Sequence, residues 1–226
     1  MPIVVNKYSI VPDESEPLPV SANLGETNQT GNEWDTLARF AVMLDVMDKY
    51  TFGHSQRVSN LATAIAGELG LDTVIQEQVR VAGFVHDIGK IIINKEVLNK
   101  DGVLSVEEYR HIVSHSIAGE RIVRSFSEDR AIPLLVRHHH ERYDGLGYPD
   151  RLKGDQIPIG AQILAVADTY DALTSDRPYR KALSNRAAIE ELKRQRGRQF
   201  DPGIVDALLR IYTDTEGVLN NLIAQN

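Results

Sequence analysis

The chain has 226 residues and no cysteine, and its formal net charge is −7 at pH 7. A hydrophobic content of 42% and a charged content of 25% are ordinary for a globular protein with one large domain and an appendage. The missing cysteines exclude disulfides, thiolate metal sites and cysteine nucleophiles. The acidic balance argues against binding to nucleic-acid polymers. No apolar run reaches the ~18 residues of a membrane helix, and the N-terminal apolar stretch is too short for a secretory signal, so we expect a cytoplasmic protein without membrane insertion.

The N-terminal part of the chain predicts two segments outside the main domain. Residues 1–32 are rich in Pro, Asn, Gly and acidic residues and offer little to bury, which is typical of a disordered or loosely ordered tail. In residues 33–50 the apolar positions follow the 3-4-3 spacing of a helical seam: Trp34, Leu37, Ala41 and Leu44. We expect a linker or packing helix there. Its seam is too short to decide between packing on the domain and forming a homodimer.

Residues 51–226 alternate helix signals with turn signals and predict an all-α domain. Helix starts are indicated by a capping box of Thr73 with Gln76, a second of Ser105 with Glu108, and Asp201 before Pro202. The expected helices are one with His54 in its first turn that Gly70 stops, one from Thr73 into His86, then 109–126, 132–140, 157–173 and two C-terminal helices, the first from Ser184. Ile91–Ile93 should extend away towards a loop. No convincing alternation predicts strands.

The stretch Phe84–Ile91 carries the strongest chemical signal, because an apolar run leads into the adjacent pair His86-Asp87. A carboxylate in such surroundings is expected to be buried, and a buried charge needs a partner. Neighbouring side chains can serve one metal ion, and the two oxygens of an aspartate can bridge two ions. The pair therefore predicts a buried metal centre.

Other residues could complete this centre. All seven histidines lie between positions 54 and 140, and Asp168 follows an apolar run, which indicates a ligand or a paired charge. His111 and His115 are four residues apart on one helix face, but no HExxH motif accompanies them, so a zinc protease is excluded. Within His138–His140, successive side chains on a helix point about 100° apart, so at most two should converge.

So many nitrogen and oxygen ligands exceed the needs of one tetrahedral ion and indicate two metals, with Fe, Mn or Zn suited to the donor set. Two ions stabilise the attacking and leaving oxygens of an in-line displacement, with a bridging hydroxide as the expected nucleophile.

Four motifs in a fixed order connect these residues to a known family. They are Tyr50–Val58 (YTFGHSQRV), His86–Lys90 (HDIGK), His139–Pro149 (HHERYDGLGYP) and Asp168–Tyr179 (DTYDALTSDRPY). With them the chain resembles the HD-GYP family, a branch of the HD phosphohydrolase superfamily, from about Tyr50 to Leu209. The order of the four motifs makes the resemblance specific.

The resemblance implies an HD-domain helical bundle with a buried metal centre. It implies a metal-dependent phosphodiesterase that hydrolyses cyclic di-GMP to linear pGpG, with GMP as a further product. Two divalent ions are expected, usually Fe or Mn, with Zn, Mg, Ni and Co as other occupants. The ligands carried over are His54, His86, Asp87 and Asp168, and for the second ion His115, His139 and His140, with Asp87 bridging. His111 and His138 match no ligand of the family. Tyr50 stands where some members have a third-metal glutamate, so we expect two ions.

The resemblance also suggests residues that act beside the metals. Lys90 follows Asp87 by about one helical turn and is expected to be catalytic at a phosphate oxygen; a salt bridge to a nearby carboxylate is the alternative. Glu141 and Asp171 are expected to orient metal ligands.

Substrate contacts are expected from two segments. The basic turn supplies Arg177, Arg180 and Lys181 for the second phosphate or the guanine edges. Gly147 and Tyr148 of the GYP loop should form a wall of the substrate site or a surface for signalling partners.

Three other functions stay open. The chain could hydrolyse another cyclic dinucleotide or nucleotide, although the GYP loop argues against a general nucleotidase. It could be a signalling module that binds nucleotide or partner proteins without turnover, although the intact ligand set argues against this. It could also be a redox-responsive di-iron protein of the hemerythrin kind, in which Lys90 and the arginine cluster would have no task.

Overall fold

The computed structural model describes residues 39, 41, 53–100, 102–176 and 181–214. The tail expected over residues 1–32 lies outside this part of the chain, as do Tyr50 and most of the helix expected over residues 33–50. Two residues of that helix are described: Arg39 and Ala41 are helical, and Ala41 is buried in the main core. This part of the segment therefore packs on the domain.

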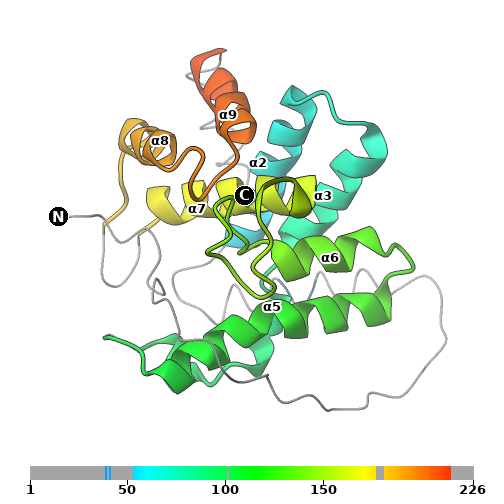
Figure 1. Cartoon of the computed structure of the whole chain (residues 1–226), viewed down its shortest axis with the longest axis vertical. Coiled ribbons are helices and arrows are strands. Elements are labelled where there is room, and N and C mark those ends of the chain that lie inside the picture. The colour runs from blue at the N-terminus through cyan, green and yellow to red at the C-terminus, as the bar shows by residue number, and fades with distance from the viewer. Residues whose placement is uncertain (1–38, 40, 42–52, 101, 177–180, 215–226) are drawn as a thin grey trace.

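The described residues form the expected all-α architecture (Figure 1). Its elements are α2 (His54–Glu68), α3 (Thr73–Val85), the 3-10 helix η1 (Ile88–Ile92), α4 (Lys95–Leu98), α5 (Val106–Phe126), α6 (Ala131–His138), the 3-10 helix η2 (Gly154–Gln156), α7 (Ile159–Thr174), α8 (Asn185–Arg194) and α9 (Pro202–Asp214). Over the same ranges, β-pairing is limited to an isolated bridge between Arg196 and Phe200.

Three helix starts, those of α5, α8 and α9, have capping residues that the sequence indicates. The Ser105 hydroxyl accepts the Glu108 N–H at 3.2 Å, and the Glu108 carboxylate accepts the Ser105 N–H at 2.6 Å, so this capping box is confirmed. Asp201 likewise caps α9 by accepting the N–H of Ile204 at 3.0 Å. The box predicted at Thr73 is wrong. The N-cap is Asp72, whose carboxylate accepts the Ile75 N–H at 2.9 Å.

Two predicted boundaries near the metal-site motifs also differ. The helix expected to reach His140 ends at His138, where the Glu141 N–H turns back to the His138 carbonyl at 2.9 Å. Ile91–Ile93 was expected to extend away, but the chain continues as η1 up to Ile92 because the N–H groups of Lys90 and Ile93 make tight-turn bonds.

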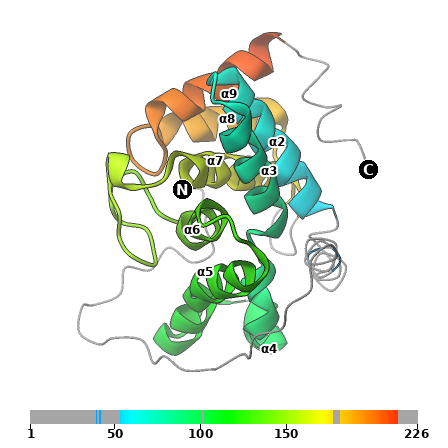
Figure 2. The same ribbon diagram turned by 90° about the vertical axis from the view of Figure 1, so that its right-hand side faces the viewer.

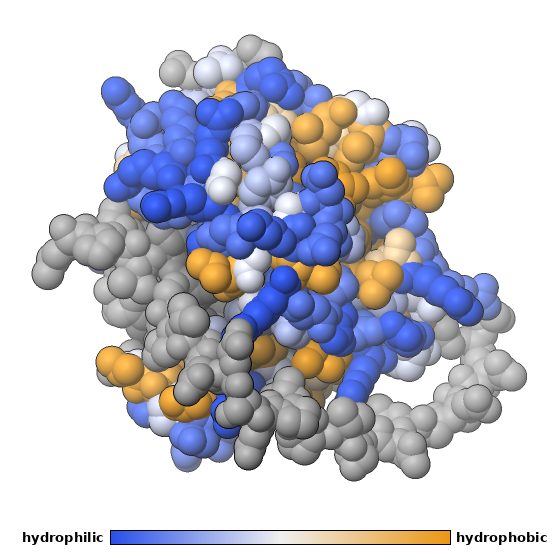
Figure 3. All heavy atoms as spheres, in the orientation of Figure 1, coloured by the Kyte–Doolittle hydropathy of each residue, from blue (hydrophilic) through white to orange (hydrophobic). Residues whose placement is uncertain are grey.

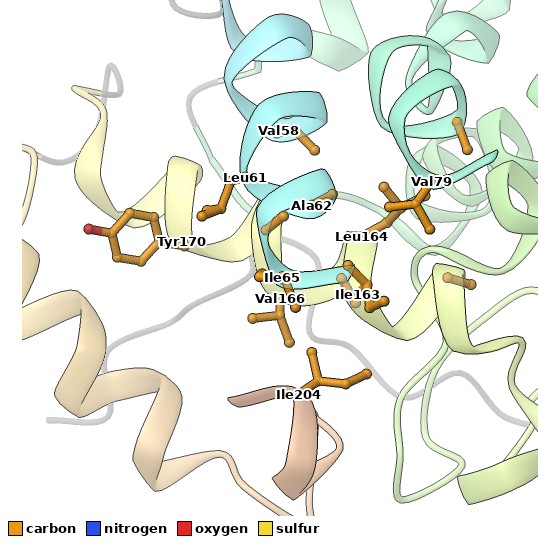
Figure 4. Close-up of a cluster of buried hydrophobic side chains, with 14 of the residues drawn as sticks. Val58, Leu61, Ala62, Ile65, Val79, Ile163, Leu164, Val166, Tyr170 and Ile204 are labelled. Carbon is orange, nitrogen blue, oxygen red and sulfur yellow. The ribbon is translucent and has the colours of Figure 1, made fainter. Parts of the chain in front are cut away.

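Helix α7 is the centre of the fold and packs against α2, α3, α6, α8 and α9. It is buried on almost all sides, and its alanines let neighbouring helices approach closely. Figure 4 shows Ile163, Leu164 and Val166 of α7 among side chains of α2, α3 and α9, including Val58, Leu61, Ile65, Val79 and Ile204. Each such side chain contributes about 1.5–3 kcal/mol by leaving water. This core fixes the helices that carry the site.

Helix α6 lies between α7 and α5 in both ribbon views (Figures 1 and 2). The short helix α4 lies beside α5 (Figure 2). Its Val97 and Leu98 pack against a second small cluster of Ile93, Leu104, Tyr109 and Ile112. On the face shown in Figure 3, hydrophilic residues gather over α8. Among the described helices, none combines the length and the apolar character needed to cross a bilayer.

Candidate metal centre and active site

Histidine and aspartate side chains from four parts of the chain meet where α3 ends. Two groups have ligand atoms within 4.8 Å of one another: His54, His86 and Asp87 form the first, and Asp87, His115, His139 and His140 form the second. Asp87 belongs to both groups, so the structure brings together six of the seven expected ligands around one shared carboxylate.

The orientation of most of these histidines is determined by the backbone of their own helix. The Nδ1 atoms of His86, His115 and His139 lie 2.6–2.7 Å from the carbonyl oxygen three residues earlier. A carbonyl oxygen can only accept, so Nδ1 carries the proton and Nε2 keeps its lone pair. His54 differs, because its Nδ1 lies 2.7 Å from a carboxylate oxygen of Asp171. In all four residues Nε2 is the atom left for a metal ion.

The two oxygens of Asp87 face different histidines. Oδ2 lies 3.5 Å from His86 Nε2 and 3.8 Å from His54 Nε2. Oδ1 lies 3.5 Å from His115 Nε2. Each oxygen therefore belongs to one group, which is the arrangement that a carboxylate bridging two ions requires.

The residues fit a divalent metal. Within the described part of the chain, Nε2 of His86 is fully buried and has no hydrogen-bond partner. Buried polar atoms are otherwise nearly always bonded, so this lone pair lacks a partner that a metal ion would supply. Imidazole nitrogens and carboxylate oxygens without thiolates are the ligand set of Fe, Mn or Zn.

The electrostatics favour the ligand forms of these side chains. Burial, reinforced by the charges of neighbouring histidines, holds the pKa of both His139 and His140 well below the usual value and also lowers that of His115. Burial tends to raise the pKa of Asp87, but the positive charge of Lys90, together with that of any histidine that is protonated, outweighs burial and holds the pKa well below its usual value. Neutral imidazoles around an ionised carboxylate are the protonation states that bind metals.

Helix α7 places two aspartates on either side of His54. Asp168 Oδ1 lies 3.4 Å from His54 Nε2, but Asp168 is outside both close groups and its side chain is 20% exposed. Asp171, one turn later, is buried and bonds His54 Nδ1 from the other side. Burial tends to lower the pKa of His54, but this bond and the negative charges of the surrounding aspartates together outweigh burial and raise the pKa. The role expected for Asp171, orienting a ligand, has the matching geometry.

Lys90 makes a direct ion pair with Oδ2 of Asp87. The salt bridge that the sequence left as an alternative is therefore present, and its partner is the shared carboxylate of the cluster. The Lys90 side chain is 27% exposed, so it reaches both the cluster and the solvent-facing side of the site.

Gly89 explains why η1 can lie so close to α5. A Cβ atom at this position would stand 1.9 Å from the His115 carbonyl oxygen and 2.5 Å from the Gly119 nitrogen. Only a residue without a side chain permits this approach. The glycine of the HDIGK motif thus brings His86 and Asp87 next to His115.

The loop after α6 forms one wall of the site. The Tyr148 ring lies against His140, with ring centroids 4.8 Å apart, and Gly147 passes so close to the backbone of residues 140–142 that a Cβ would clash. Glu141 does not orient a histidine as expected. Its carboxylate instead accepts the N–H groups of Asp150 at 2.6 Å and Leu152 at 3.1 Å, and so holds the loop.

The two histidines that match no family ligand have other partners. His111 Nε2 accepts the Asn94 N–H at 3.2 Å, and His138 Nε2 lies 2.9 Å from Asp150 Oδ2. Because the helix ends at His138, the next two residues turn away, and the rings of His139 and His140 come together at 3.9 Å. The prediction that at most two of the three histidines in His138–His140 converge on one site is confirmed.

The expected substrate cations are only partly described. Arg177 and Arg180 lie outside the described residues. The Lys181 side chain is 93% exposed and stands 3.5 Å from Asp176, so the structure leaves it in solvent.

Sequence reasoning assigned no role to two arginines that support the site. Arg57 lies one turn after His54 and donates to both oxygens of Asp171, at 2.5 and 3.1 Å. Arg57 is three residues after His54, and this spacing, which places both side chains on one face of a helix, could have indicated the role. Arg137 donates to Asp150 in the loop and to Glu120 of α5, and no spacing in the sequence indicates that pairing.

Comparison with known proteins agrees with this geometry. The sequence model of the family described as "HD domain" matches residues 38–204. The chain belongs to the HD domain family. The resemblance to its HD-GYP branch is likewise confirmed by relatives named as cyclic di-GMP phosphodiesterases.

The relatives are longer proteins. The cyclic di-GMP phosphodiesterase response regulator RpfG of Xanthomonas campestris is 43% identical over 84% of this chain and 50% of its own length. The cyclic di-GMP phosphodiesterase of Thermotoga maritima is 36% identical over 79% of this chain and 49% of its own. A 3'3'-cGAMP-specific phosphodiesterase of Vibrio cholerae is 34% identical over 75% of this chain and 40% of its own. The chain thus spans half or less of the length of these relatives.

Solved structures share the fold. A cyclic GMP-AMP specific phosphodiesterase of V. cholerae superposes with a TM-score of 0.67 and 18% identity, over 85% of this chain and 51% of that one. The HD domain of the L. monocytogenes phosphodiesterase PgpH, in complex with cyclic-di-AMP, gives 0.54 and 23% identity, over 84% of this chain and 98% of that one. The HD-domain helical bundle is therefore shown.

Proposed function

We propose that this chain is a metal-dependent phosphodiesterase that hydrolyses cyclic di-GMP to linear pGpG, with GMP as a further product. The observation that carries the proposal is the position of Asp87, whose two oxygens face two separate groups of histidines. Relatives that are 36–43% identical and bear the name cyclic di-GMP phosphodiesterase support this substrate.

Two divalent ions, Fe or Mn, are assigned to the two groups. His54, His86, Asp87 and Asp168 would hold one ion, and Asp87, His115, His139 and His140 the other. When bound, such ions polarise phosphate oxygens and lower the pKa of water. In the absence of thiolates, the neutral imidazoles leave most of the ions' charge available to the substrate.

The other side chains of the site hold and orient the substrate. Lys90 exchanges its contact with Asp87 for a nonbridging phosphate oxygen and so stabilises charge that develops there. Tyr148 forms an aromatic wall on which a base can stack, and Gly147 keeps this wall against His140. Arg177, Arg180 and Lys181 stay proposed contacts of the guanine edges or the second phosphate.

A second cyclic dinucleotide is also a candidate substrate. The relatives named as 3'3'-cGAMP-specific phosphodiesterases are 33–35% identical, close to the range of the cyclic di-GMP enzymes. Signalling proteins are proposed partners at the GYP loop, where Leu146 is 66% exposed. Homodimerisation stays a prediction.

The test is product analysis. The purified protein, reconstituted without oxygen with Fe(II) or Mn(II), is incubated with cyclic di-GMP and, in parallel, with 3'3'-cGAMP. We expect linear pGpG, loss of product with a chelator, and loss of both metal and turnover in Asp87→Ala. Arg80→Ala is the matched control, because Arg80 forms an exposed pair with Glu77 on α3. Turnover of neither nucleotide by the metal-loaded protein would overturn the proposal and favour a module that binds without catalysis.

A further inference from the structure

Arg151, two residues after the GYP motif, has a backbone conformation that an arginine rarely adopts. Its φ is 54°, and among the described residues it is the one non-glycine with positive φ. The left-handed region disfavours residues with a Cβ atom, because the Cβ approaches the next carbonyl oxygen. Such outliers persist where the surrounding structure forces them, and they gather at ligand sites.

The residues on both sides of Arg151 are fixed. The Glu141 carboxylate accepts the N–H groups of Asp150 and Leu152, the two chain neighbours of Arg151. The Asp150 carboxylate is held in turn by Arg137 at 2.6 and 2.8 Å and by His138 at 2.9 Å. The loop therefore presents the Arg151 side chain from a rigid base and does not leave it on a free hairpin.

An aromatic path leads from the metal cluster towards Arg151. Tyr148 lies against His140, and the Tyr109 ring meets Tyr148 edge to face at 6.5 Å. Burial raises the pKa of the Tyr109 phenol, and the positive charge of Arg151 acts in the opposite direction, so the guanidinium is within electrostatic range of that hydroxyl. Arg151 follows Tyr148 by three residues, and Glu141 holds the backbone on both sides of it, so the loop places Arg151 beside the wall that begins at His140.

We propose that the Arg151 guanidinium binds the phosphate of the cyclic dinucleotide that is not being cleaved. This inference rests on the proposed function and adds a substrate-binding residue to it. A cyclic dinucleotide carries two phosphates, and the metal centre with Lys90 accounts for one. On a protein of net charge −7 the other phosphate needs positive charge as well, and Arg151 adds to the basic turn a guanidinium that offers it two parallel donors.

The test separates the second phosphate from the first. The metal-loaded protein is assayed with cyclic di-GMP and with bis(p-nitrophenyl) phosphate, a diester with one phosphate and no base. In Arg151→Gly we expect the KM for cyclic di-GMP to rise about tenfold or more, and the ratio of kcat/KM between the two substrates to fall by a similar factor. Calorimetric binding of a nonhydrolysable bis-phosphorothioate analogue of cyclic di-GMP should weaken equally.

The substitution is chosen to keep the fold. Glycine adopts positive φ without strain, so the variant should unfold at a temperature no lower than the unchanged protein. Arg151→Asn is the second variant, because asparagine also tolerates this region. Arg151→Lys keeps the charge but loses the two parallel donors, so its affinity should lie between those of the unchanged protein and Arg151→Gly. Arg80→Ala removes a remote positive charge and should leave the ratio between the substrates unchanged.

Three results would overturn the inference: an unchanged KM and unchanged analogue affinity in both Arg151→Gly and Arg151→Asn, an equal loss with both substrates, or the same effect in Arg80→Ala. Failure of the proposed function looks different, because the unchanged protein would then cleave bis(p-nitrophenyl) phosphate but not cyclic di-GMP.

Discussion

At the scale of single residues, the site depends on which nitrogen of each histidine is free. In His86, His115 and His139 a carbonyl one turn earlier occupies Nδ1, so the local helix alone orients the ring. His54 stands at the start of α2 and has no carbonyl one turn earlier in its own helix. Its Nδ1 is therefore bound by a carboxylate from α7, that of Asp171. Asp171 is therefore the residue on which the orientation of His54 depends.

Asp171→Asn should weaken metal binding about 10- to 100-fold, the usual effect of removing a carboxylate behind a ligating histidine. The amide keeps the size of the side chain but loses the charge that holds His54 and Arg57. Affinity is measured by competition with a fluorescent chelator, and circular dichroism checks the fold. Asp176→Asn makes the same change in an exposed pair with Lys181 and should have no effect. A folded Asp171→Asn protein with full affinity would show that His54 needs no such support.

At the scale of elements, the site is assembled by close approach. Helix η1 carries Lys90 and follows directly on Asp87, and it lies against the middle of α5, where His115 is placed. The loop after α6 is tied to α5 and α6 by Arg137. Both junctions bring together segments whose separation in sequence gives no sign of contact.

Gly89→Ala should destabilise the protein by at least about 2 kcal/mol, because the new methyl group meets backbone atoms of α5 that cannot move aside. Urea unfolding of the chelator-treated protein measures the change in unfolding free energy. Gly102→Ala is the control, since a Cβ there has no atom within 4 Å, and it should change stability by less than about 0.5 kcal/mol. Equal stability of the two variants would contradict the tight junction.

The ion pair between Asp150 and Arg137 should make the loop sensitive to acid. The hydrogen bond from Arg137 is the main cause that lowers the pKa of Asp150 from 3.8 to about 2. A carboxylate with a lowered pKa stabilises the fold above its unfolded pKa, and this contribution is lost as the pH falls from about 4 to about 2. Because the side chain is 35% exposed, screening limits the effect to about 1 kcal/mol.

The comparison of the unchanged protein with Asp150→Asn isolates this contribution. Unfolding free energies in urea, measured in chelator from pH 7 to pH 3, should differ by a constant amount above pH 4 or so and converge below it. A difference that stays constant down to pH 3 would contradict the lowered pKa.

At the scale of the whole molecule, the candidate metal centre joins several helices. Ligand candidates come from α2, α3 with the turn after it, α5, the end of α6 and α7. Ions that bind only the folded chain stabilise it in proportion to the logarithm of their concentration relative to Kd. Metal binding and folding are therefore coupled across the whole domain.

Removal of the metals should lower the midpoint temperature of thermal unfolding by about 5 °C or more. At a metal concentration of 100 Kd, binding stabilises the folded chain by about 2.7 kcal/mol, and in a chain of this size each kcal/mol shifts the midpoint by about 2–4 °C. Thermal unfolding with and without chelator measures the shift. Asp87→Ala, which should lose both ions, is expected to respond little to chelator. If chelator leaves the midpoint of the metal-loaded, unsubstituted protein unchanged, the cluster does not bind ions tightly.

The sequence by itself determined the all-α class, several of the helix starts and six of the side chains that the fold gathers into the candidate metal centre. These depend on local physics: capping side chains, apolar periodicity, and histidines and carboxylates placed after apolar runs, as at His86 and Asp87. The four motifs added the family. Local patterns fail where the chain departs from a regular helix, as at Ile91–Ile93 and His139.

Only the tertiary structure decided how these residues work together. It showed that the two oxygens of Asp87 face different histidines. It also showed that Glu141 binds the backbone of the loop and does not orient a histidine, and that Arg137 connects this loop to α5. It also showed the left-handed backbone of Arg151. Each of these depends on distances between segments far apart in the sequence, and such distances are set by the packing of the whole core around α7.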